Sequence, residues 1–229
     1  MGAPFEEKII WHDEILPRQT KKALEFLSKQ TWLKRSSWYL AGGTALALQT
    51  GHRSSVDLDF FTSQDGFNNA NLLKHFLKNS SWRTNINSEG TIYGELFGAK
   101  VSFIAYPFFK PSQQSDYYGT IRVLSPTDIA VMKIIAISQR GRKRDFFDLY
   151  WYAKNFEPLE KTILRLKKQY PKVAHNYHHI LKSLVYFADA ENDPMPRINF
   201  NASWPLVKNF FIKEVPKITN KIIGLIHSV

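Results

Sequence analysis

The sequence predicts a mixed α/β unit over residues 1–125, followed by a helical unit over residues 126–229. In the first unit, short apolar or alternating segments typical of strands lie between segments with helical spacing. From Ser125 onward the pattern is helical, and Ser125-Pro126-Thr127-Asp128 supplies an N-cap, a first-turn proline and an acid at the third helical position. We therefore predict two units with a boundary near residue 125.

The elements of the first unit alternate along the chain. Apolar residues at helical spacing, or high helix propensity, predict helices over 6–34, 44–50 and 67–79. Short apolar runs or alternation predict strands over 38–41, 56–61, 91–97, 100–106 and 121–124. The third and fourth of these strands form a predicted hairpin that turns at Gly98-Ala99.

The second unit is expected to consist of helices. One begins at Ser125, a second begins near Arg144 after the break at Gly141, and further helices are expected over 159–190 and 203–227. The Asn192–Pro196 turn separates the last two segments.

Composition narrows the class of protein. The 229 residues contain no cysteine, which excludes disulfides, thiolate zinc sites and cysteine nucleophiles. Residues 1–8 lack the basic and apolar pattern of a secretory signal, and charged residues interrupt every apolar stretch before the length of a membrane span. We therefore expect a soluble, cytoplasmic protein that makes no membrane contact. The net charge of +11 favours polyanionic partners such as RNA or nucleoside triphosphates.

Two acids on one strand are the first candidate site. Asp57 and Asp59 are two residues apart, so on a strand they project from the same side, about 6.6 Å apart along the chain. Val56, Leu58 and Phe60 then face the core. Adjacent carboxylates repel unless a cation lies between them, and hard oxygen ligands suit Mg²⁺ or Mn²⁺. The pair predicts a metal site for phosphoryl or nucleotidyl transfer.

Gly42-Gly43-Thr44 lies between a predicted strand and a predicted helix. Glycines allow the backbone to approach a phosphate, and the N–H groups and positive end of the helix favour its charge. We expect the Thr44 hydroxyl to meet the same oxygens, and Arg53 to contact the triphosphate or the acceptor.

The stretch Leu40–Phe61 (LAGGTALALQTGHRSSVDLDFF) resembles the first motif of the polymerase-β-like nucleotidyltransferases, and in detail that of the AbiEii/AbiGii toxin family. Asp128-Ile129-Ala130, Lys133 and the block Arg144–Tyr150 extend the resemblance to residues 38–153. It implies a mixed sheet flanked by helices with a helical C-terminal domain, Mg²⁺ and an NTP substrate. It further implies an acceptor such as RNA, because some members modify tRNA 3′ ends, and the toxin role of a toxin–antitoxin pair with a cognate antitoxin.

The same family carries a lysine on a helix and an Asp-x-x-Asp on the next helix, here Lys133, Asp145 and Asp148. Lys133 lies among apolar residues, so its ammonium either contacts a phosphate or an acid, or extends to solvent. We expect Asp145 to lie closer to the chemistry than Asp148, and an ion pair with the basic run Arg140–Arg144 is the alternative for Asp145. That run itself is either a solvated loop or a grip on a nucleic-acid backbone.

The sequence departs from the superfamily at the third carboxylate, which many members carry on a later strand. Ser102 stands at that position. With a turn at Gly98-Ala99, Glu95 would lie opposite Ser102 and could replace the acid, or it could be a solvated edge residue.

Two alternative functions remain beside the transferase. One is a catalytically degenerate protein that binds nucleotide or nucleic acid, which Ser102 favours, and the other is an interaction protein whose main partner is an antitoxin.

Overall fold

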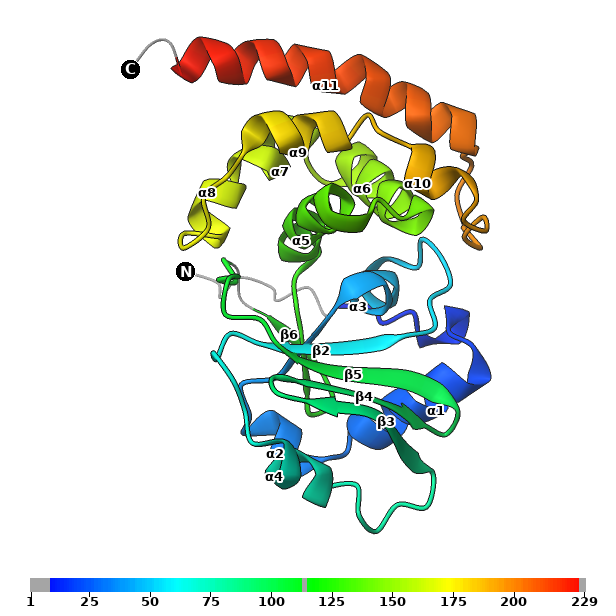
Figure 1. Ribbon diagram of the computed structural model, residues 1–229. Helices are drawn as coiled ribbons and strands as arrows, with labels where there is room; N and C mark the ends of the chain where they lie inside the picture. Colours follow the sequence, from blue (N-terminus) through cyan, green and yellow to red (C-terminus); the bar gives the residue numbers. More distant parts are fainter. Residues whose placement is uncertain (1–8, 113–114, 227–229) are drawn as a thin grey trace, which may run out of the picture.

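The computed structural model of the protein describes residues 9–112 and 115–226 (Figure 1). The segment 1–8, on which the expectation about a secretory signal rests, lies outside these ranges. Within the described ranges, every helix is too short or too polar to cross a membrane.

The described residues form a seven-stranded mixed sheet in the order β3-β4-β5-β2-β1-β7-β6. The central strand β2 pairs in parallel with β5 and antiparallel with β1, and β1 pairs in parallel with β7. The strands span Tyr39–Ala41 (β1), Leu58–Thr62 (β2), Trp82–Ser88 (β3), Thr91–Leu96 (β4), Ala99–Ala105 (β5), Asp116–Tyr118 (β6) and Ile121–Val123 (β7).

Helices cover both faces of the sheet (Figure 1). One face carries α1 (Arg18–Leu27), α2 (Thr31–Lys34) and α4 (Asn69–Lys74). The other carries α3 (Gly42–Thr50), and above it lie α5 (Pro126–Arg140) and α6 (Lys143–Asn155). The remaining helices complete this layer: α7 (Leu159–Leu164), α8 (Leu166–Gln169), α9 (Tyr177–Ser183), α10 (Ala188–Glu191) and α11 (Trp204–Ile226). The predicted mixed sheet with flanking helices and a helical C-terminal region is confirmed.

The alternation of β2 places its side chains on two different faces. Leu58 and Phe60 are fully buried, and the ring of Phe60 stacks on Phe103 of β5 at 5.1 Å between centroids. Asp59 and Phe61 face the side of the sheet that α3 and α5 cover, where a cavity lies between sheet and helix. Val56 does not face the core as expected; it precedes the strand and is 50% exposed.

The structure differs from the sequence prediction at two strands and one turn. β3 and β6 were not predicted, because almost all their side chains are exposed or half-exposed and no apolar alternation marks them. The β4–β5 turn is Phe97-Gly98, with φ values of 53° and 81°, rather than Gly98-Ala99. This shift of the turn places Glu95 opposite Lys100, and Tyr93 opposite Ser102.

The helical predictions were too long in places. The segment 6–34, predicted to be helical with a second piece opening at Pro17, contains a short 3-10 helix at Asp13–Ile15, then α1, which follows Pro17, and α2. The segment 159–190 divides into the four short helices α7 to α10. Buried side chains of α3 and α5 belong to the same hydrophobic core as those of the sheet. The boundary at residue 125 stays a prediction.

Candidate active site

A cavity of ≈ 660 Å³ lies between the sheet and α5. Two carboxylates, Asp57 and Asp59, line it together with five cationic side chains: Arg53, Lys100, Lys133, Arg140 and Arg144. An excess of positive charge around two acids suits an anionic ligand that arrives with a cation.

The two predicted acids lie at the glycine corner. Asp59 begins the cavity face of β2, and a Cβ built on Gly42 would lie only 3.0 Å from its Oδ2, so the carboxylate covers the first residue of α3. The Ser102 hydroxyl donates to Asp59 Oδ1 at 2.7 Å. Asp57 immediately precedes β2 and also faces the cavity. The side chains therefore converge as the sequence predicts, and their roles as metal ligands stay predictions.

Electrostatics at this pair favour a bound cation. Burial raises the pKa of Asp59 above its ordinary value; the hydrogen bond from Ser102 opposes that shift, and the charge of Asp57 adds to it. Across residues 9–112 and 115–226 there is no cluster of three His, Cys, Asp or Glu side chains able to hold a metal. The donor set is thus two carboxylates, which is the number that Mg²⁺ takes when phosphate oxygens supply further ligands.

Glycine is required at both positions of the corner. Gly42 has φ +72°, a left-handed conformation that side chains disfavour. A Cβ on Gly43 would lie 2.2 Å from Nη2 of Arg53. Ala41 at the N-cap of α3 has no side chain that could accept from the first-turn N–H groups, so these donors and the helix dipole face the cavity end where the acids lie.

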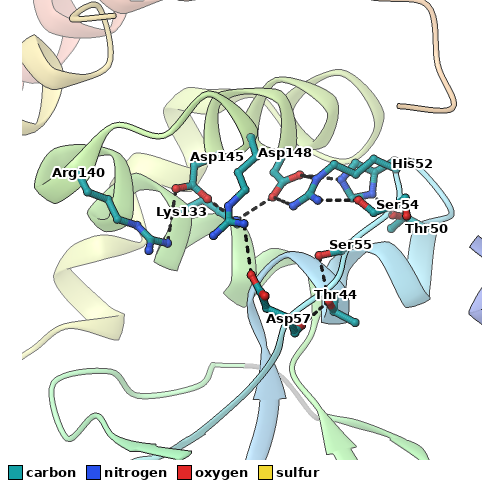
Figure 2. Close-up of polar contacts among 12 residues, drawn as sticks. Thr44, Thr50, His52, Ser54, Ser55, Asp57, Lys133, Arg140, Asp145 and Asp148 are labelled. Atoms are coloured by element: carbon teal, nitrogen blue, oxygen red, sulfur yellow. Dashed lines mark hydrogen bonds and ion pairs between the residues drawn. The ribbon is translucent and has the colours of Figure 1, made fainter. Parts of the chain in front are cut away.

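The hydroxyl of Thr44 has a different partner from the one expected. Thr44 is buried, and its Oγ1 lies 2.5 Å from the carbonyl oxygen of Asp57 and 2.9 Å from the hydroxyl of Ser55 (Figure 2). The prediction that it meets phosphate oxygens is thereby corrected. The hydroxyl of Thr44 instead links α3 to the segment that carries Asp57.

Arg53 is held in a buried ion pair. Its Nε and Nη2 donate to the two oxygens of Asp148 at 2.5 and 2.8 Å, and Nη1 donates to the carbonyl of Ser54. The ring of His52 contacts Asp148 Oδ1 at 2.9 Å. Each of the three guanidinium nitrogens thus has a partner within the protein, although Arg53 also lines the cavity. The contact of Arg53 with the triphosphate or the acceptor stays a prediction.

Asp148 is the centre of this network. It is fully buried and also lies 2.8 Å from the ammonium of Lys133. Burial raises the pKa of Asp148, but the charges of Arg53 and Lys133 outweigh that effect and hold its pKa well below the ordinary value. Burial lowers the pKa of His52, against the carboxylate of Asp148, which raises it.

Lys133 contacts acids, which is one of the alternatives left open by the sequence. Its Nζ lies 2.5 Å from Asp145 Oδ1, and Figure 2 shows the lysine between Asp145 and Asp148. Asp145 is fully buried, with Arg140 Nη2 at 3.6 Å from Oδ2. Neither Asp145 nor Asp148 lines the cavity, and Asp145 makes the ion pair that the sequence left as its alternative. That Asp145 lies closer to the chemistry than Asp148 stays a prediction.

Glu95 does not take the place of a third carboxylate. It accepts from Arg83 Nη2 at 3.0 Å, and it is not among the residues that line the cavity. The side chain that stands beside Asp59 on the neighbouring strand is Ser102, which is paired with it in register.

An apolar wall on α5 completes the cavity, and nothing in the sequence indicated its role. Met132, Ile135 and Ala136 on α5 are half-buried and line the cavity, with Gln139 one turn further. These positions follow the helical i, i+3, i+4, i+7 spacing of a buried stripe. Apolar side chains of the sheet face them across the cavity: Phe61, Ile104 and Tyr106.

The basic run after α5 divides into two groups. Arg142 pairs with Asp193 at 2.9 Å, and the ammonium of Lys143 donates to backbone carbonyls of Glu191 and Asp193. Arg140 and Arg144 line the cavity instead, and Arg144 Nη1 lies 3.3 Å from Asp57 Oδ2.

Comparison with known proteins agrees with this arrangement. The sequence model of the family described as nucleotidyl transferase AbiEii toxin, type IV TA system, matches residues 26–87 and 92–205. An uncharacterized protein of Aquifex aeolicus (strain VF5) is 36% identical over 187 residues, which cover 79% of this chain and 87% of that protein.

Two solved structures share the fold. A candidate nucleotidyltransferase from H. pylori superposes with a TM-score of 0.52 at 17% identity, covering 91% of this chain and 98% of the other. MenT4, a nucleotidyltransferase toxin from Mycobacterium tuberculosis H37Rv, superposes with a TM-score of 0.52 at 14% identity, covering 89% and 86%. With the matched family covering most of its length, the chain belongs to the AbiEii family of nucleotidyltransferase toxins.

Proposed function

We propose that this protein transfers a nucleoside monophosphate from a Mg²⁺-bound NTP to a hydroxyl group of an RNA acceptor. The observation that carries the proposal is the meeting of Asp57 and Asp59 with the glycine-cornered start of α3 at one end of a cationic cavity. The acceptor oxygen bonds to the α-phosphorus, the bond from that phosphorus to the β-phosphate bridging oxygen breaks, and pyrophosphate leaves. The hydroxyl proton passes to solvent.

Asp57 and Asp59 would hold the metal. The raised pKa of Asp59, the charge of Asp57 beside it and the all-oxygen donor set fit Mg²⁺, and also Mn²⁺. When bound, the ion supplies neutralisation of the phosphate charge that grows during transfer. The Ser102 hydroxyl fixes Oδ1 of Asp59 and leaves the other oxygen facing Gly42.

The rest of the cavity suits the remainder of an NTP. The first-turn N–H groups of α3 would donate hydrogen bonds to phosphate oxygens, since Gly42 and Gly43 leave the backbone uncovered there. The apolar walls of α5 and the sheet would take the nucleobase between them, with the Gln139 amide at the rim. Arg53 and Lys133 would hold neighbouring residues of the site in place, because their charges are neutralised by buried acids.

RNA is proposed as the acceptor on two grounds. The chain carries a net charge of +11, and Arg140 and Arg144 bring part of that charge to the cavity. The family to which the chain belongs bears the name of toxins in type IV toxin–antitoxin systems. On the same ground we propose a cognate antitoxin as a partner, and a small DNA-binding regulator in the adjacent reading frame would support it.

The test is NTP-dependent labelling of total RNA. The protein is incubated with RNA, Mg²⁺ and each α-³²P-labelled NTP in turn, and the same NTPs labelled on the γ-phosphate serve as a chemical control. We expect label on RNA only from the α-position. The variant Asp57→Asn with Asp59→Asn should remove labelling and stay folded.

A matched pair of exposed acids outside the cavity controls for the loss of two charges: Asp65→Asn with Asp116→Asn should label as well as wild type. Retained labelling in the Asp57/Asp59 variant would refute the metal assignment.

A catalytically degenerate nucleotide-binding protein is the second candidate, and Ser102 favours it. Its hydroxyl occupies the position next to Asp59 where superfamily members often carry a third acid. This candidate predicts calorimetric NTP binding without pyrophosphate release in the presence of RNA, whereas the transferase predicts both.

A further inference from the structure

Arg144 is the cation that touches a proposed metal ligand. It is the second residue of α6, its side chain is 45% exposed, and its Nη1 lies 3.3 Å from Asp57 Oδ2. Only one nitrogen makes the contact, and the side chain of Asp57 is itself 25% exposed. The pair is therefore open to solvent and single-pronged, unlike the bidentate buried pair of Arg53 with Asp148.

The position of Arg144 conflicts with a metal on the same acid. A divalent ion at Asp57 and a guanidinium on the same carboxylate oxygen repel each other and compete for the same lone pairs. The buried network around Asp145 and Asp148 does not face this conflict, because Lys133 and Arg53 are bound to these two acids rather than to Asp57. A metal on Oδ2 of Asp57 would therefore displace Arg144 and leave Lys133 and Arg53 in place.

A triphosphate offers Arg144 a better partner. The guanidinium is a planar fork that matches two phosphate oxygens, and Arg144 already lines the cavity into which the triphosphate would enter. The half-exposed side chain can turn without breaking a buried contact. We propose that Arg144 is a substrate-binding residue with two positions: it pairs with Asp57 before the nucleotide arrives and binds triphosphate oxygens afterwards. This inference rests on the proposed transferase function.

The two positions have opposite effects on two ligands. Without nucleotide, Arg144 competes with the metal for Asp57, so Arg144→Gln should bind Mn²⁺ about threefold more tightly than wild type. With Mg²⁺ present, the same variant lacks the fork for the triphosphate and should bind NTP about tenfold more weakly. A residue that merely shaped the cavity would not move the two affinities in opposite directions.

The experiment titrates the full-length protein in two ways. Mn²⁺ alone is followed by electron paramagnetic resonance, and ATP, CTP, GTP and UTP are each followed by calorimetry with Mg²⁺ and without RNA. Arg142→Gln is the matched control. Arg142 lies two residues from Arg144, carries the same charge and pairs with Asp193. The control should leave both affinities at the wild-type value.

Each outcome decides the matter. Tighter Mn²⁺ binding together with weaker NTP binding in Arg144→Gln supports the two positions. A change in only one titration, or values equal to those of Arg142→Gln in both, overturns them. Asp57→Asn separates the inference from the proposed function: if that variant binds Mn²⁺ as wild type does, the metal assignment itself fails, whatever Arg144 does.

Discussion

Removal of the charge at Asp148 is the sharpest test of how the site is held. Asp148 is fully buried and accepts from Arg53 and Lys133, each within 2.8 Å, and contacts the ring of His52 at 2.9 Å. Asp148→Asn keeps the size of the side chain but leaves two buried cations with Asp145 as their one remaining fully buried acid. Breaking a buried pair from one side costs about 3–5 kcal/mol, far more than an exposed pair.

The loss of unfolding free energy in Asp148→Asn can be measured by urea denaturation followed through tryptophan fluorescence. For a chain of this length 1 kcal/mol corresponds to roughly 2–4 °C, so the melting temperature should fall by about 6–20 °C. Glu95→Gln is the control, since it breaks the ion pair with Arg83, whose side chain is 71% exposed, and should leave the unfolding free energy nearly unchanged. A loss of under about 1 kcal/mol in Asp148→Asn would refute the idea that the network holds the corner.

The effect should also depend on pH in a defined direction. The pKa of Asp148 is well below its ordinary value of 3.8, so the folded protein binds this proton less readily than the unfolded chain. The stability that Asp148 contributes is therefore complete above its unfolded pKa and is lost as pH falls through the folded pKa. We expect the difference in unfolding free energy between wild type and Asp148→Asn to persist at about pH 5 and to shrink below the ordinary value. A difference that grows in acid would contradict this reasoning.

Three further perturbations probe the cavity. Gly43→Ala places a Cβ against the pinned guanidinium of Arg53 and should cost about 1–3 kcal/mol in urea unfolding; no loss would show that Arg53 can move freely. Ser102→Asp buries a third acid beside Asp59, so its melting temperature should rise more with Mn²⁺ than that of wild type, and an equal rise would count against metal binding there. Ile135→Asn puts an amide on the apolar wall and should weaken calorimetric NTP binding about tenfold, whereas Ile212→Asn on exposed α11 should not; equal affinities would remove the nucleobase from this wall.

Local sequence signals predicted the elements that carry the site. The strand, glycine pair, short helix and acidic strand over 38–61 follow one another with clear propensities, and Gly42 with φ +72° explains why glycine ends the strand. The strand β3 was missed because it lies at the sheet edge with almost every side chain exposed. The β4–β5 register was missed because Phe97, a non-glycine residue, adopts a positive φ.

The partners of the charged residues could not be read from the sequence. Arg53 and Asp148 are separated by 95 positions, and no local pattern indicates which of several acids an arginine will meet. What the apolar stripe of α5 faces could not be predicted from the sequence either. Its spacing is that of a core face, and only the packing shows that Met132, Ile135 and Ala136 face a cavity rather than another helix.

The distribution of charge separates support from ligand binding within one site. Asp148 and Asp145 neutralise Arg53 and Lys133 on the helical side of the cavity, and two of these four residues belong to α6, far along the chain from the glycine corner. The neutralised layer positions Gly43 and the acids without attracting a ligand. Cations with weaker protein contacts, above all Arg144, remain able to bind an anionic ligand that enters the cavity. Variants of this neutralised layer should therefore change unfolding free energy first, and variants at Arg144 should change ligand affinity with stability intact.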